Sequence, residues 1–151
     1  MLSYETIFSR VRGKINDPKE WSLDDEDLFE VYTERLHSTA GNVRIRKLFS
    51  TLKLDDESEG ITWELKTTIQ GADPDEEEEF VIELFTLGMV IEWLRPKVED
   101  ITNIGLIIGG KEEKTINNMH KTNVERLKSL ETQLSKMVRD HGYLYNDYLQ
   151  G

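Results

Sequence analysis

Glu34 and His37 are the first residues in this sequence whose types and spacing could do chemistry. A carboxylate and an imidazole three residues apart on one helix can share a metal ion, as in helical di-iron proteins. Those proteins need two such pairs and two further Glu residues, whereas neither His120 nor His141 follows a carboxylate at that spacing here. We therefore expect no metal ion, no cofactor and no catalytic residue. A small helical metal-dependent enzyme built around Glu34 and His37 is kept as an alternative hypothesis.

The segment 105–112, with the sequence GLIIGGKE, is close to the pattern of a phosphate-binding loop. Its glycines and Lys111 fit that pattern, but Glu112 stands where a Ser or Thr hydroxyl should hold magnesium, and a carboxylate there repels phosphate. The intervening side chains are bulky, and no strong strand precedes them. The segment is therefore predicted to be a helix break followed by a solvated loop.

Asp73, Asp75 and Glu77 are spaced like the first ligands of a calcium-binding loop. Glu78 occupies the position that requires Gly, and Leu84 occupies the position of the closing Glu. The same acids suit the start of a helix, where Asp73 can cap and the others lie at the positive end of the helix dipole. Helix capping is the predicted role of this cluster.

The chain of 151 residues is acidic, with 30 Asp and Glu against 19 Lys and Arg and a net charge of −11. The first 80 residues hold 20 acidic and 10 basic groups, so this half carries almost all of the excess. That balance disfavours binding to the outside of nucleic acid or to an anionic membrane, while it suits a surface past which DNA slides. There is no Cys, which excludes disulfides and thiolate zinc sites. No apolar stretch is long enough to span a bilayer, and we expect a soluble, intracellular protein.

The elements that must position these residues are predicted to be mostly helical. A first short helix lies between Ser3 and a stop at Pro18, and a second runs from a cap at Ser22 to a stop at Gly41. Their buried faces are given by apolar residues at helical spacing: Ile7, Phe8, Val11 and Ile15 in the first, and Leu28, Val31, Tyr32 and Leu36 in the second.

The segment 42–69 carries both helical and alternating patterns. We expect a helix over about 43–52 and then a short β-hairpin around 50–66, with a turn at 55–60. Ile61, Leu65 and Ile69 also fit a helix capped by Asp55 or Asp56, so hairpin and helix both stay open for residues 50–69.

Two longer helices follow in the second half of the chain. One begins at Asp73-Pro74 and continues into 80–94, which is apolar almost all round and therefore predicts a helix surrounded by others, ended or kinked by Pro96. The other is predicted over about 122–141, ending at Gly142, with an apolar stripe on one face and His141 as a cation near its C-terminus. The fold class is thus mainly α, a bundle-like single domain over 1–142.

The last residues, 143–151, form a predicted C-terminal interaction tail. It is rich in aromatic and apolar side chains but too short to fold alone, and Tyr is enriched where proteins meet. Folding back onto its own domain and docking onto a neighbour both remove this apolar surface from water, and both stay open. The residues predicted to contact a partner are Tyr143, Tyr145, Tyr148 and Leu149.

Five stretches of the chain resemble a known family. They are YETIFSRVRGKINDP, LDDEDLFEVYTERLHS, FVIELFTLGMVIEWLRPKV, GGKEEK and RDHGYLYNDYL. Together they resemble the head-to-tail connector proteins, also called adaptor or neck proteins, of tailed bacteriophages. The resemblance covers most of the chain, although none of these stretches is a chemical motif.

The resemblance implies a mainly helical virion structural protein that forms a ring, often of twelve subunits, between portal and tail. It implies contacts with copies of itself, with the portal protein and with a tail-completion or other neck protein, and DNA that only passes through the channel. It implies no catalysis. An acidic DNA mimic that inhibits a host nuclease is the other alternative, supported by the acidic first 80 residues.

Overall fold

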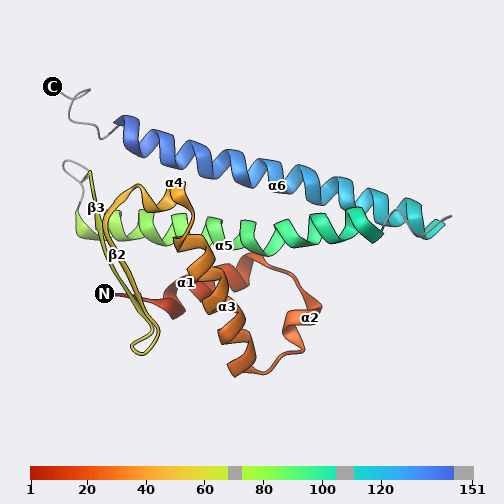
Figure 1. Ribbon diagram of the computed structural model, residues 1–151, viewed down its shortest axis with the longest axis horizontal. Helices are drawn as coiled ribbons and strands as arrows, with labels where there is room; N and C mark the ends of the chain where they lie inside the picture. Colours follow the sequence, from red (N-terminus) through yellow and green to blue (C-terminus); the bar gives the residue numbers. More distant parts are fainter. Residues whose placement is uncertain (68–72, 105–110, 145–151) are drawn as a thin grey trace.

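The computed structural model describes residues 1–67, 73–104 and 111–144, with side chains for all of these except 100–104, 111–113, 115, 116 and 142–144. Within these residues the chain is mainly helical, and it carries one small antiparallel sheet (Figure 1). The fold class predicted from the sequence is therefore confirmed. No helix in the described part is long and apolar enough to cross a membrane.

The chain begins with a two-residue strand and three helices. Strand β1 is Leu2–Ser3, and the helices are α1 (Tyr4–Lys14), α2 (Pro18–Trp21) and α3 (Asp25–Ala40). Helix α1 starts after Ser3, as expected, and Ser3 caps it by accepting a hydrogen bond from the Glu5 amide. The predicted end of α3 at Gly41 is right.

One expectation for this region is wrong. Ser22 does not cap α3; Asp24 does, accepting from the Asp27 amide at 2.8 Å, because a carboxylate also suits the positive end of the helix. The predicted stop is right, since α1 ends at Lys14, and Pro18 opens the single turn of α2, because proline fits a first helical turn and Asp17 caps it.

A one-turn helix and a β-hairpin follow. Helix α4 is Val43–Arg46, strand β2 is Phe49–Asp55 and strand β3 is Gly60–Leu65. The hairpin is confirmed, and the helix predicted over 43–52 is wrong beyond its first turn. Alternation decides between the two patterns, because Leu52 pairs with Trp63 and Leu54 with Ile61, and these four side chains are buried or half-buried. Strand β1 joins the other edge of β3, so the order is β1-β3-β2.

Helices α5 (Pro74–Ile104) and α6 (Lys111–Leu144) lie side by side and run antiparallel along the length of the molecule (Figure 1). Both are longer than predicted. Helix α5 continues through Pro96, since proline removes only one helical hydrogen bond and Val98 beyond it still packs on the core. Helix α6 starts eleven residues before the predicted start and does not stop at Gly142.

The core is built around the middle of α5. Helices α1, α3 and α6 all pack on it, and the sheet lies near its first turns (Figure 1). The apolar side chains of α5 that are at most 6% exposed point to several sides of the helix: Val81, Ile82, Leu84, Phe85, Met89, Val90, Ile91, Trp93 and Leu94. The prediction that 80–94 is surrounded by other elements is confirmed.

Gly88 lies where α5 crosses α3, and its lack of a side chain permits that crossing. A Cβ at this position would lie 2.4 Å from Cγ2 of Thr39 and 3.2 Å from Cδ1 of Ile45. Thr39 cannot easily move, because it is buried, β-branched and donates a hydrogen bond from Oγ1 to the Arg35 carbonyl at 2.8 Å.

Substitution of Gly88 by Ala is expected to lower the free energy of unfolding by about 1–3 kcal/mol, the usual cost of overpacking. Gly13→Ala is the matched control, because no atom lies within 4 Å of its added Cβ and the helix gains about 0.5–1 kcal/mol. Urea unfolding followed by circular dichroism measures both. Equal stability of the two variants would show that α3 and α5 do not pack this closely.

Candidate interaction surface

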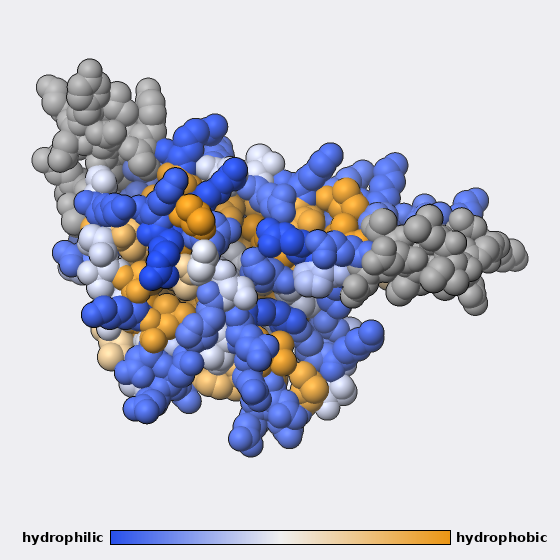
Figure 2. Space-filling view, in the orientation of Figure 1, coloured by the Kyte–Doolittle hydropathy of each residue, from blue (hydrophilic) through white to orange (hydrophobic). Residues whose placement is uncertain are grey.

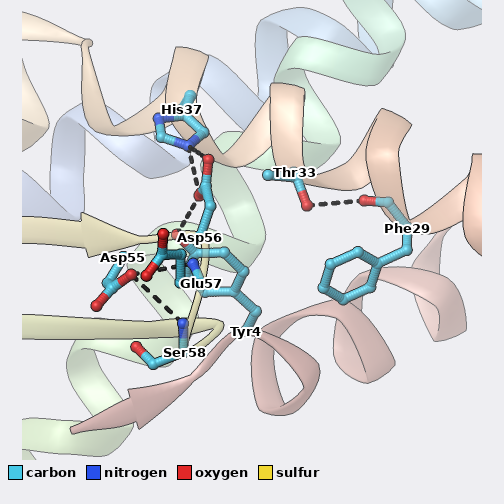
Figure 3. A network of polar contacts seen from close by, with 8 residues as sticks. All are labelled: Tyr4, Phe29, Thr33, His37, Asp55, Asp56, Glu57 and Ser58. Carbon is cyan, nitrogen blue, oxygen red and sulfur yellow. Dashed lines mark hydrogen bonds and ion pairs between the residues drawn. The ribbon is translucent and has the colours of Figure 1, made fainter.

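Glu34 and His37, the pair of the alternative enzyme hypothesis, do not belong to a metal-binding group in the described part of the chain. His37 lies within hydrogen-bond distance of Asp56, with Nε2 at 2.8 Å from Oδ1 and 3.1 Å from Oδ2 (Figure 3). The Glu34 side chain is exposed. No group of three or more His, Asp or Glu side chains in the described part of the chain is placed to hold a metal ion. The His37–Asp56 contact instead joins α3 to the hairpin turn.

The hairpin turn is held by a small polar network (Figure 3). The Tyr4 hydroxyl donates to Oδ1 of Asp56 at 2.7 Å, and Oδ1 of Asp55 accepts from the amides of Glu57 and Ser58. The hydrogen bonds from Tyr4 and then from His37 lower the pKa of Asp56, because they stabilise its charged form. The network joins the turn to the start of α1 and to the end of α3. Its role is structural.

The acids at the start of α5 serve the helix, as predicted. Oδ1 of Asp73 accepts from the Glu76 amide at 2.9 Å, which caps α5. Glu79 holds both terminal nitrogens of Arg10 on α1, one of them at 2.9 Å. The hydrogen bond to Arg10 lowers the pKa of Glu79. Of the phosphate-loop segment, residues 105–110 lie outside the described residues and Lys111 begins α6.

Trp93 is the centre of a buried cluster that sequence patterns did not reveal. Its Nε1 donates to Oδ2 of Asp17 at 2.9 Å, and Lys97 binds the same oxygen at 2.8 Å. Lys97 and Arg126 both lie over the indole ring, at 5.3 and 5.5 Å from its centroid. Burial disfavours the charge on Asp17, but the hydrogen bonds from Lys97 and Trp93 outweigh it and lower the pKa. The cluster fixes the α1–α2 connection against α5 and α6.

Helix α6 contacts the rest of the molecule through one side only. Its apolar stripe lies against α5, yet of its described apolar side chains only Leu134 is fully buried. Met119 is 56% exposed, and the others are half-covered: Val124, Leu127, Leu130, Met137 and Val138. In the face that Figure 2 shows, apolar surface is accordingly visible among the hydrophilic side chains along the α5–α6 pair.

A groove lies between α1, α5 and α6, and we call it the α1–α5–α6 groove. It encloses about 490 Å³. Its floor is apolar and its walls carry three basic side chains with one acidic side chain, Glu83. The apolar residues are Leu87, Val90, Leu130 and Met137, and the basic ones are Arg10, Lys14 and Arg126. Because Glu79 pairs with Arg10, the basic charge that remains in the groove is that of Lys14 and Arg126, against the single carboxylate of Glu83.

An exposed apolar pair lies between α1 and α3. The side chain of Trp21 is 65% exposed and that of Leu23 is 37% exposed. The segment that carries them is nonetheless fixed: Asp17 caps α2, and Glu20, only 7% exposed, forms an ion pair with Arg35 on α3. An indole held rigidly in water is a common feature of surfaces that bind other proteins.

The residues predicted to contact a partner fall at the end of the described chain. Tyr143 belongs to the last turn of α6, which ends at Leu144, so the boundary placed at residue 142 does not coincide with the end of the helix. Tyr145, Tyr148 and Leu149 lie outside the described residues. Their role in binding stays a prediction.

Comparison of the chain with family models, with curated proteins and with solved structures found no match.

His141 is not the surface cation that the sequence suggested. Its ring is 3% exposed and stacks on Phe80 of α5, with the ring centroids 4.6 Å apart and the planes at 18°. Burial lowers its pKa, and the backbone of Thr67 and the charge of Glu77 oppose this only in part. A neutral imidazole therefore packs the C-terminal end of α6 onto the start of α5.

The protein is expected to lose stability as the pH falls below about 6.5, the ordinary pKa of His. The unfolded chain then binds a proton on residue 141 that the folded chain excludes, which costs at most about 1.4 kcal/mol per pH unit. His141→Phe keeps the stacked ring but cannot titrate, so its stability should change less between pH 7 and pH 5.5. Urea midpoints measured across this range provide the check. Equal slopes for both proteins would show that His141 is protonated in the folded state.

Proposed function

We propose that this chain is a non-enzymatic structural protein of a bacteriophage neck, a head-to-tail connector subunit that assembles into a ring between portal and tail. The proposal rests first on the resemblance of five stretches of the sequence to that family. The half-covered apolar stripe of α6 is the structural observation that carries it. A stripe of this kind costs free energy in water unless another protein covers it, at roughly 25 cal/mol per Å².

The shape of the molecule suits this role. The α5–α6 pair forms a long, straight wall, because the two antiparallel helices of 31 and 34 residues pack along their length (Figure 1). Subunits in a ring need two different surfaces, one on each side, that fit each other. The α1–α5–α6 groove and the exposed Trp21 segment are two such different surfaces on one chain.

The charge of the chain is consistent with a DNA channel. A net charge of −11 repels the phosphate backbone, so DNA can pass an acidic wall without being held. The acidic DNA mimic needs its carboxylates free to face a basic enzyme. Several acids of the first 80 residues have structural partners instead, among them Asp17, Glu20, Asp24, Asp56 and Glu79. No specific observation favours the mimic over the connector.

Purified protein is expected to assemble on its portal partner. Light scattering of the protein alone, with the portal protein, and with a tail-completion protein measures the mass, and negative-stain images show the shape of any large species. The connector proposal predicts rings, or complexes that form only when the portal ring is present. A monomer or dimer that ignores both partners would contradict it. A major tail protein from the same phage serves as a control for nonspecific binding.

The C-terminal residues are expected to strengthen that assembly. Replacing Tyr145, Tyr148 and Leu149 together by Ser should leave the circular dichroism spectrum and the melting temperature of the monomer unchanged, and should weaken binding to the portal ring by about tenfold or more. The control replaces the polar neighbours Asn146 and Gln150 by Ser. If both variants bind the portal ring equally well, the C-terminal tail is not part of the interface.

A further inference from the structure

The Trp21 segment presents an apolar, acidic projection, here named the Trp21 knob: Trp21, Leu23 and the acids at 24–27. All four acids are exposed, and none of them forms an ion pair with a described residue. The α3 cap uses the Asp24 carboxylate and the Asp27 backbone amide. The negative charges of the four acids therefore still face water. The knob thus combines a large apolar side chain with local negative charge.

The knob is rigid before it meets a partner. Besides the Asp17 cap and the Glu20–Arg35 ion pair, the Ser22 hydroxyl donates to the Lys19 carbonyl at 2.7 Å. Asp17 is in turn fixed by Trp93 and Lys97 of α5. The backbone that carries Trp21 is therefore fixed, which lowers the conformational entropy lost when the indole is covered, one of the main costs of association.

The α1–α5–α6 groove has the complementary properties. Four apolar side chains line it, and its volume of about 490 Å³ lies in the range of sites that enclose whole small ligands. Arg10 is neutralised by Glu79, which leaves two basic side chains, Lys14 and Arg126, against one carboxylate, Glu83. Lys14 is exposed and its ammonium has no ion-pair partner in the described residues. Arg126 stays close to it by donating to the Lys14 carbonyl at 3.1 Å.

The knob does not fill the groove of its own chain. No residue of the knob lines the groove, and Trp21 remains 65% exposed. A knob and a groove at different places on one molecule make a heterologous contact, in which each copy uses its knob on one neighbour and its groove on the other. Repetition of such a contact closes into a ring when the rotation between copies allows it.

We propose that the Trp21 knob of one copy docks into the α1–α5–α6 groove of the next copy. This inference rests on the proposed connector function, because it names the contact by which the ring would form. The indole covers the apolar floor, and the acids at 24–27 face Lys14 and Arg126. The contact weakens with salt, since part of it is electrostatic and exposed to solvent.

Two variants test the knob and the groove separately, and both change exposed side chains. Trp21→Ala removes the knob side chain, and Lys14→Glu with Gln133→Glu places two carboxylates at the groove opposite the acidic knob. The matched controls are Met119→Ala, which truncates an apolar side chain that is 56% exposed, and Lys128→Glu with Thr132→Glu, which makes the same charge change outside the groove. Circular dichroism and urea unfolding confirm that all four fold.

Association is measured by sedimentation, alone and on the portal ring. Trp21→Ala is expected to weaken association between copies by about thirtyfold, as for a Trp at the centre of an interface, and the groove variant by about tenfold. Both controls should associate like the wild type. The decisive sample mixes the two defective variants: one retains its knob and the other its groove, so they should form one-to-one dimers that cannot grow.

The outcomes distinguish this inference from the connector function. If Trp21→Ala forms rings or portal assemblies as well as the wild type does, the knob contact is wrong. The connector function is then not contradicted. Defective variants that do not complement each other when mixed overturn it too, because a symmetric contact between identical patches behaves in that way. A wild-type protein that neither self-associates nor joins the portal ring overturns both proposals.

Discussion

The α5 segment over 80–94 is apolar almost all round, and this forces the rest of the chain to surround it. Each apolar side chain buried there contributes on the order of 1.5–3 kcal/mol relative to exposure, so most of the helix surface must be covered by other elements. Helix α1 covers one side through Ile7 and Val11, and α3 covers another through Leu36, all three side chains being 0% exposed. Phe49 of the sheet reaches Phe85, with the ring centroids 6.1 Å apart. Helix α6 takes the side that remains.

Because α6 covers only what the other elements leave, its own apolar stripe is wider than its contact with α5. Leu130 and Met137 of this surplus line the α1–α5–α6 groove, on the flank beside α1. The stripe is thus held in place by α5, while part of it stays in contact with solvent. The same constraint that makes the fold stable therefore leaves apolar surface partly uncovered.

The parts of the fold that the sequence predicted are those set by local spacing. The helical spacing of Ile7 and Val11, the Asp73 cap and the all-apolar run over 80–94 each identify an element by its own residues. The failures depend on distant contacts. Residues 49–52 become strand because they pair with 60–65, and α6 extends past its predicted ends because it lies along a longer α5.

The candidate surface was harder to predict than the fold, for the same reason. His141 stands at a helix end, where sequence reasoning expects a charge, yet Phe80 from another helix buries it. Trp93 is one of several apolar residues in its helix, and only the fold brings Asp17 and Arg126 to its ring. An exposed indole such as that of Trp21 leaves no spacing pattern at all, because its exposure follows from how neighbouring elements fail to cover it.

The acidic residues bear on function only after those that stabilise the fold have been set aside. Asp55 and Asp73 cap backbone amides, and Glu20 and Glu79 neutralise arginines on other elements, so these carboxylates serve the fold. The acids at 24–27 differ from them, because only one caps a helix and all face solvent beside an exposed indole. Negative charge concentrated next to apolar surface directs that surface toward a basic site, and the α1–α5–α6 groove is such a site on the same molecule. Charge pattern and shape therefore favour contact between copies, whereas net charge alone would fit any acidic helical protein.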